Sequence, residues 1–152
     1  MRLDAPSFLR AHIVTIDARR LELRDIFERL ITALGNKEFD RVESLLTEDA
    51  IFDWPYLPLD TMAERMIGAK TFRNFCEQGM ETCDPYRHKM TEFYDLLEPD
   101  AIIAEYYSDT IFRPTGARYS NKYLAIARFR GDRVCYWKEY INPMIVKNVM
   151  GI

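Results

Sequence analysis

The stretch AIIAEYYSDTIFRPTGARYSNKYLAIARFRGDRVCYWKEYI, residues 101–141, determines the fold of this chain. It holds three long runs that are rich in aromatic and β-branched residues, and the breaks between them are short and carry turn-forming residues. Long extended runs joined by short turns form antiparallel hairpins. We therefore predict strands at Ala101–Arg113, Arg118–Arg130 and Arg133–Ile141, preceded by a fourth at Tyr86–Leu97.

The half of the chain before this sheet has helical periodicity. Leu23, Phe27 and Leu30 recur with neighbouring apolar residues at three- and four-residue spacing, which predicts a helix over Asp17–Leu34. Because helices that are segregated from an antiparallel sheet pack on one face of it, we predict an α+β domain. The other predicted elements are helices at Lys37–Leu46 and Ala69–Met80, a strand at Ala50–Trp54, a loop at Tyr56–Ala63, and a short tail or helix after Asn142.

Length and composition indicate one globular domain, residues 1–152. Apolar residues make up 48% of the chain and charged residues 30%; the net charge is −3, without a basic run, which argues against a nucleic-acid partner. No apolar stretch approaches the roughly eighteen residues that cross a bilayer, and Met1–Pro6 lacks the apolar core of a secretion signal. Three cysteines and two histidines match no metal-site spacing, so we expect reduced thiols, a cytoplasmic location and no metal.

Aromatic residues reach 13% of the chain, and tyrosines gather in its second half. A helix layer that lies obliquely on a curved sheet leaves a conical hollow, which is a place for a small-molecule site. Alternation along each predicted strand assigns residues to faces. The faces of interest carry Glu105 with Tyr107, Tyr119 with Asn121 and Tyr123, and Trp137 with Glu139. A carboxylate in such an apolar niche has a raised pKa, which suits proton transfer near neutral pH.

Three motifs resemble the NTF2-like superfamily, and within it the SnoaL-like branch that is related to ketosteroid isomerases. They are EDAIFDWP at Glu48–Pro55, MIGAK at Met66–Lys70 and WKEYINP at Trp137–Pro143. The resemblance extends from about Asp17 to Met150. It implies a cone-shaped, curved and mostly antiparallel sheet wrapped around three N-terminal helices, with a pocket at the mouth of the cone. It also implies a homodimer formed through the outer face of the sheet.

Within the superfamily, the second half of the chain is most similar to the small condensing proteins of phenazine biosynthesis. The acid/base glutamate of that family falls on Glu139, whereas its pocket histidine falls on Phe75. Ketosteroid isomerases use an aspartate at the end of the first strand, which falls within one residue of Asp53, but no tyrosine occurs in Asp17–Leu34. The arginine–aspartate pair of limonene-epoxide hydrolases falls on Ile103 and Glu105, so the arginine is missing.

The predicted catalytic residues are therefore Glu139, Asp53 and Glu105. The predicted substrate-binding residues are Tyr119, Asn121, His88, Trp54, Tyr56, Phe75, Tyr107 and Trp137. The main candidates have structural alternatives. Glu139 could be satisfied by a tyrosine or by the surroundings of Lys138, and Glu105 could be the partner of an arginine or tyrosine. Asp53 could be a turn cap, His88 a rim residue, and the aromatic residues part of the core.

These candidates support three functional hypotheses. The first is a cofactor-independent acid/base enzyme, an isomerase, cyclase or condensing type, that acts on a small apolar carbonyl-bearing or polycyclic metabolite. In it Glu139 or Asp53 moves a proton, while Tyr119 and Asn121 stabilise charge on oxygen. The second is a protein that binds a small molecule, or serves in assembly, without chemistry. The third is epoxide hydrolysis by carboxylate-activated water.

Overall fold

The computed structural model describes residues 7–57 and 59–152, with side chains from residue 18 onward. The prediction for Met1–Pro6 lies outside these residues. The helices are α1 (Ser7–Gly35), α2 (Phe39–Ser44), α3 (Ala69–Gly79) and α4 (Pro143–Met150). The strands are β1 (Leu46–Asp53), β2 (Arg65–Ile67), β3 (Arg87–Asp95), β4 (Ala101–Phe112), β5 (Ala117–Arg130) and β6 (Arg133–Ile141). The predicted α+β class is confirmed.

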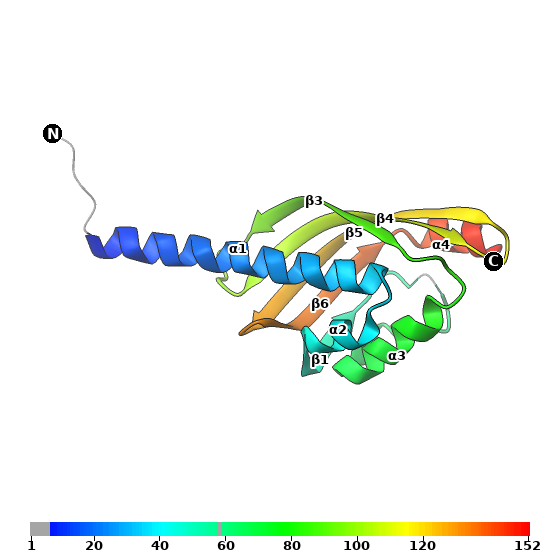
Figure 1. Cartoon of the computed structure of the whole chain (residues 1–152), viewed down its shortest axis with the longest axis horizontal. Helices are drawn as coiled ribbons and strands as arrows, with labels where there is room; N and C mark the ends of the chain where they lie inside the picture. Colours follow the sequence, from blue (N-terminus) through cyan, green and yellow to red (C-terminus); the bar gives the residue numbers. More distant parts are fainter. Residues whose placement is uncertain (1–6, 58) are drawn as a thin grey trace.

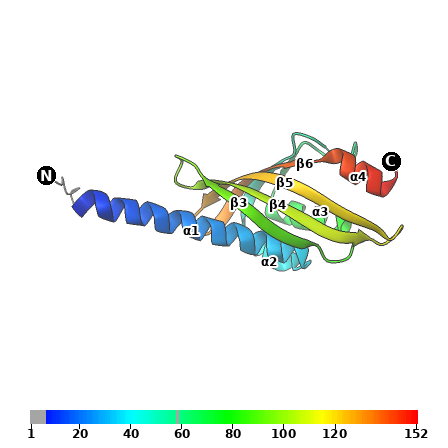
Figure 2. The same ribbon diagram turned by 90° about the horizontal axis from the view of Figure 1, so that it is seen from above.

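The six strands form one curved, open sheet in the order β2-β1-β6-β5-β4-β3. All neighbours pair antiparallel except β1 and β6, which are parallel. The chain leaves the sheet after β2, passes through α3 and returns at β3, and the last strand of the meander, β6, lies beside β1. Helices α1, α2 and α3 lie against one side of the sheet, and α4 lies at the end of the sheet away from the N-terminus (Figure 1). The first part of α1 extends past the strands (Figures 1 and 2).

The core lies between α1 and the inner face of the sheet. The stripe that α1 turns toward the sheet is buried, and Phe27 at its centre has no exposed surface. The ring of Phe27 packs edge-on against Tyr106 of β4 and Trp137 of β6, with centroid distances of 6.0 and 5.5 Å. Beside it, Phe52 of β1 stacks on Phe72 of α3. Burying each such side chain contributes about 1.5–3 kcal/mol, so these contacts fix the helices on the sheet.

The ends of several elements differ from the prediction. Helix α1 begins at Ser7, ten residues earlier than expected, and the three-residue strand β2 was not predicted because it is too short to show alternation. The segment after Asn142 is a helix: the Asn142 side chain accepts a hydrogen bond from the Met144 N–H, and Pro143 occupies the first turn. Gly151 then ends α4 in the left-handed conformation that favours glycine.

The two faces of β4 are opposite to the prediction. Ile102, Ala104 and Tyr106 are buried against the helices, whereas Glu105 and Tyr107 lie on the outer face. The prediction for β5 is confirmed, since its alternate residues from Tyr119 to Phe129 are the buried ones. The homodimer through the outer face of the sheet stays a prediction. No helix in the described part of the chain combines the length and the apolarity needed to cross a membrane.

Gly35 ends α1 where the helix approaches the start of β3 most closely. Its carbonyl oxygen accepts a hydrogen bond from the Tyr86 N–H at 2.9 Å. A Cβ atom at this position would overlap the carbonyl oxygen of Tyr86 and lie 2.7 Å from His88 Nδ1. The absence of a side chain at Gly35 is therefore what lets α1 and β3 meet.

We expect Gly35→Ala to lower the free energy of unfolding by about 1–3 kcal/mol, because the added methyl group must displace backbone. Gly79→Ala is the matched control, since Gly79 also ends a helix but an added Cβ there meets nothing within 4 Å. Urea denaturation measures both variants. Equal stability of the two variants would contradict the close approach at Gly35.

Candidate active site

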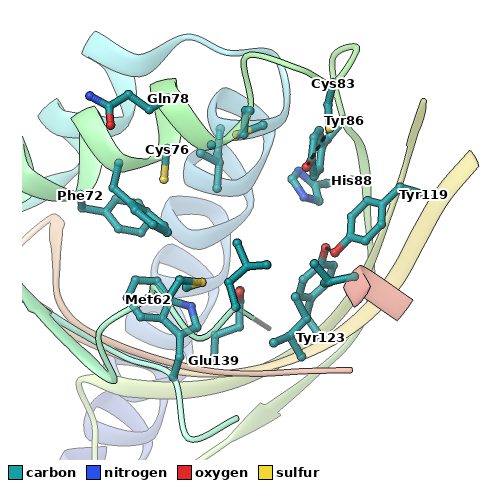
Figure 3. Close-up of a pocket in the computed structure, with 18 of the residues that line it drawn as sticks. Met62, Phe72, Cys76, Gln78, Cys83, Tyr86, His88, Tyr119, Tyr123 and Glu139 are labelled. Carbon is teal, nitrogen blue, oxygen red and sulfur yellow. Dashed lines mark hydrogen bonds between the residues drawn. The ribbon is translucent and has the colours of Figure 1, made fainter. Parts of the chain in front are cut away.

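A cavity of about 450 Å³ lies between the helices and the inner face of the sheet. Its size falls in the range of small-molecule sites. Aromatic and aliphatic side chains form most of its walls, and residues of α4 and of the segment before β2 also line it. Among the described lining residues, Glu139 is the one carboxylate, and none is a lysine or arginine. Figure 3 shows Glu139 on one wall, with His88, Tyr86 and Tyr119 on a second wall and Phe72 and Cys76 facing them.

Glu139 projects inward from β6 because it lies on the same strand face as Trp137 and Ile141, which also line the cavity. The Tyr106 hydroxyl donates a hydrogen bond to Glu139 Oε2. Desolvation raises the pKa of Glu139 to about 7, and the N–H and O–H donors around it, Tyr106 first and then Trp54 and Trp137, act in the opposite direction. The Trp137 indole N–H is buried without a hydrogen bond of standard geometry. We attribute the raised pKa to burial without a cationic partner.

A second polar group is a chain of hydroxyls next to the carboxylate. The Tyr119 hydroxyl lies 3.1 Å from the Tyr123 hydroxyl, which in turn lies 2.8 Å from Ser108 Oγ. Asn121 Nδ2 donates to the Tyr119 hydroxyl at 3.1 Å and to the Asn142 carbonyl at 3.0 Å. Burial raises the pKa of both Tyr119 and Tyr123, so both remain protonated hydrogen-bond donors.

His88 lines the cavity from the start of β3. Its Nδ1 lies 3.1 Å from the carbonyl oxygen of Ile31 in α1, and its ring contacts those of Tyr86, Tyr106 and Tyr123. Burial lowers the pKa of His88 to about 4, so the imidazole is neutral at physiological pH. The contact with Ile31 therefore ties the helix to the sheet at the wall of the cavity.

The cavity brings together six of the eleven residues that the sequence nominated: Glu139, His88, Tyr119, Trp54, Phe75 and Trp137. Their functional roles stay predictions. The other five nominated residues, which are Asp53, Glu105, Tyr107, Asn121 and Tyr56, do not line the cavity.

Asp53 is displaced from the cavity by strand alternation. Its neighbours Phe52 and Trp54 face the cavity, so Asp53 points to the other side of β1. There it accepts two hydrogen bonds from Arg65 of β2, at 2.7 and 2.8 Å, and a third from the Tyr136 hydroxyl at 2.7 Å. The Arg65 guanidinium holds the pKa of Asp53 below its usual range. A paired carboxylate outside the cavity does not suit the predicted role as a base.

The other corrections have similar causes. Glu105 lies on the outer face of β4 and accepts a hydrogen bond from the Tyr94 hydroxyl, and Tyr107 shares that face. Tyr56 is 60% exposed and packs against Tyr140. Asn121 is 1% exposed and lies behind Tyr119, so it positions that hydroxyl instead of contacting a ligand.

Sequence reasoning missed Tyr106, the hydrogen-bond partner of Glu139. A signal for it was present in β4. Glu105 and Asp109 put two carboxylates on one face of that strand, whereas Ile102, Ala104 and Tyr106 put none on the other. Charged residues prefer solvent, so the uncharged face was the better choice for the interior. Tyr86 was also missed, although alternation along the predicted strand Tyr86–Leu97 puts it on the same face as His88.

The comparisons with known proteins agree with this fold. The model of the SnoaL-like domain matches residues 27–137. The chain belongs to the SnoaL-like family.

Individual relatives are similar over most of the chain. YesE of Bacillus subtilis is 24% identical over 127 residues, which cover 84% of this chain and 86% of YesE. A crystal structure described as "Putative Isomerase from Bacillus subtilis" has a TM-score of 0.77 at 20% identity and covers 88% of this chain and 95% of its own. A phenazine biosynthesis-related protein from Pseudomonas aeruginosa has a TM-score of 0.68 at 14% identity, covering 87% and 89%.

The raised pKa of Glu139 predicts a pH dependence of stability. The ordinary pKa of a glutamate is 4.5, and that of Glu139 in the folded protein is about 7. Between these two pH values the folded protein keeps a proton on Glu139 that the unfolded chain releases. The unfolded state therefore binds fewer protons, and this residue makes stability fall as pH rises through that window. We expect wild-type protein to lose on the order of 3 kcal/mol relative to Glu139→Gln across it.

Urea denaturation of both proteins at a series of pH values measures this difference. The subtraction cancels the contribution of His88, whose lowered pKa acts with the opposite sign between its folded value of about 4 and its ordinary 6.5. A wild-type-minus-variant difference that stays constant with pH would show that Glu139 is ionised normally.

Proposed function

We propose that this SnoaL-like protein is a cofactor-independent acid/base enzyme of the isomerase, cyclase or condensing type. Its substrate is a small, largely apolar carbonyl compound that binds in the cavity. One observation carries the proposal: Glu139 is the single carboxylate among the described residues of a largely apolar cavity, held by Tyr106 and shifted by burial to a pKa of about 7. A proton-transfer group works best when its pKa lies near the working pH.

The mechanism begins with the ionised carboxylate. Glu139 removes a proton from the carbon next to the substrate carbonyl, and the electron pair of that C–H bond moves onto the carbonyl oxygen to form an enolate. The Tyr119 hydroxyl, positioned by Asn121, donates a hydrogen bond to this oxygen. Where a C=C bond is conjugated with the enolate, Glu139 returns the proton to the far end of that system, which shifts the double bond and isomerises the substrate. Alternatively, the enolate carbon attacks a second carbonyl and closes a ring, and Glu139 gives its proton to the alkoxide that forms.

The apolar walls support this chemistry in two ways. They hold a largely apolar substrate, and they exclude the water that would solvate the carboxylate and weaken its hydrogen bonds. The isomerase description of the Bacillus subtilis structure and the phenazine-biosynthesis description of the Pseudomonas protein are compatible with the proposal, although at 20% and 14% identity they support the fold alone.

A binding protein without chemistry is the second candidate, because nearly the whole cavity wall is apolar. It differs from the enzyme in one respect: Glu139 would then serve to complete the hydrogen bond with Tyr106 and would move no proton. Epoxide hydrolysis, the third hypothesis, finds no specific support, since the described cavity residues hold one carboxylate and no arginine.

Proton exchange tests the proposed function before the natural substrate is identified. We expect the protein to speed the exchange of the α-hydrogens of indanone, a bicyclic ketone, with D₂O, measured by proton NMR. Glu139→Gln should slow this exchange about a hundredfold or more, the range typical for loss of a general base. Glu105→Gln, on the outer face of β4, is the matched control and should exchange at the wild-type rate. Wild-type exchange in Glu139→Gln would remove Glu139 from the mechanism.

The pH profile tests the direction of proton transfer. Because Glu139 acts as a base in its ionised form, kcat/KM for exchange should rise with pH through an apparent pKa of about 7 and level off above it. A profile that falls across the same range would assign Glu139 the opposite role, that of a general acid.

A further inference from the structure

The hydrogen bond from His88 to helix α1 fixes where the imidazole carries its proton. Nδ1 lies 3.1 Å from the carbonyl oxygen of Ile31. A backbone carbonyl oxygen only accepts hydrogen bonds, so Nδ1 must be the protonated nitrogen. The aromatic rings around His88 are uncharged phenols, those of Tyr86, Tyr106 and Tyr123, and none of them stabilises a cationic imidazolium by an ion pair.

The neutral ring therefore has a lone pair on Nε2. No described side chain or backbone group donates a hydrogen bond to this nitrogen, and it is not among the described buried atoms that lack a partner. Because His88 lines the cavity, Nε2 is open to the interior of the cavity. This nitrogen is a hydrogen-bond acceptor on a wall that otherwise offers tyrosine hydroxyls (Figure 3).

We propose that Nε2 of His88 accepts a hydrogen bond from a hydroxyl group of the ligand, so that the substrates are hydroxylated carbonyl compounds. This inference rests on the proposed function for the carbonyl group alone. The hydroxyl requirement follows from His88 itself, because only a ligand that carries an O–H or N–H group satisfies an acceptor that the protein leaves open.

Tyr106 connects the two polar groups that such a ligand would reach. Its ring contacts His88, with centroids 5.9 Å apart, while its hydroxyl binds Glu139. His88 and Glu139 thus contact the same phenol side chain, one through its ring and the other through its hydroxyl. A ligand that reaches both must carry its hydroxyl and its reactive carbonyl at separate positions, as a hydroxylated bicyclic ketone does.

Three related ketones test this inference by binding alone. They are indanone, an indanone with a hydroxyl on the aromatic ring away from the carbonyl, and the same compound with a methoxy group in place of the hydroxyl. Both tryptophans of the chain line the cavity, so quenching of tryptophan fluorescence reports binding directly. We expect the wild-type protein to bind the hydroxy compound about tenfold more tightly than the methoxy compound, the effect of one good hydrogen bond.

Two substitutions separate the acceptor from the structural contact of His88. His88→Asn keeps a side-chain N–H near the Nδ1 position, and hence the bond to Ile31, but removes the acceptor. His88→Gln places an amide oxygen near the Nε2 position and removes the bond to Ile31. We expect the hydroxyl preference to be lost in His88→Asn and kept in His88→Gln, while thermal denaturation shows His88→Gln to be the less stable variant.

Equal binding of the hydroxy and methoxy compounds by wild-type protein would overturn the inference, as would failure of all three ketones to bind or an unchanged preference in His88→Asn. Nitrogen NMR gives an answer that needs no ligand and no variant: a neutral His88 protonated at Nδ1 is expected, and a proton on Nε2 overturns the proposal. The proposed function fails in a separate measurement, the Glu139-dependent proton exchange of unsubstituted indanone. That compound has no hydroxyl for His88 to bind, so its exchange does not depend on the inference about His88.

Discussion

The contact between the Tyr106 hydroxyl and the Glu139 carboxylate, inside a largely apolar cavity, is the constraint on which the rest of this structure depends. A carboxylate that is removed from water without a cation is costly in its ionised form. The protein meets that cost with hydrogen-bond donors, Tyr106 foremost, and not with a salt bridge. The result is a group balanced between its two protonation states near neutral pH, which is the property that proton transfer needs.

The surrounding fold supplies what this balance requires. Phe27 of α1 packs against both Tyr106 and Trp137, so the helix that closes the core also fixes the strands from which the carboxylate and its partner project. Gly35 lets the end of the same helix reach β3, where His88 hydrogen-bonds back to Ile31. The neighbouring carboxylate Asp53 is satisfied outside the cavity by Arg65 and does not compete for the site.

The sequence was sufficient for the α+β class, the three helices that cover the sheet, the long strands and the face of β6 that carries Glu139. These depend on periodicities that extend over many residues and on clear turn residues. Sequence reasoning failed where the orientation of a single strand had to be decided from a few residues. The faces of β4 were exchanged because Ile103 and Tyr107 look as apolar as Ile102 and Tyr106, and only the pair Glu105 and Asp109 indicated the outer side.

The site was less predictable than the fold for a related reason. Alternation showed that Asn121 is inward but not that Tyr119 lies between it and the cavity. It placed Asp53 at the end of a strand but gave no sign of Arg65, because the strand β2 that presents this arginine is only three residues long. Hydrogen-bond partners such as Tyr106 for Glu139 arise from packing between strands that are far apart in the sequence, which no single-strand pattern contains.

The most direct test of this account is a titration of the Glu139 side-chain carboxyl carbon by NMR, assigned by comparison with Glu139→Gln. The account predicts a single transition with a pKa of about 7. A transition near 4.5, the ordinary value of a glutamate, would mean that water reaches the carboxylate and would contradict the central claim.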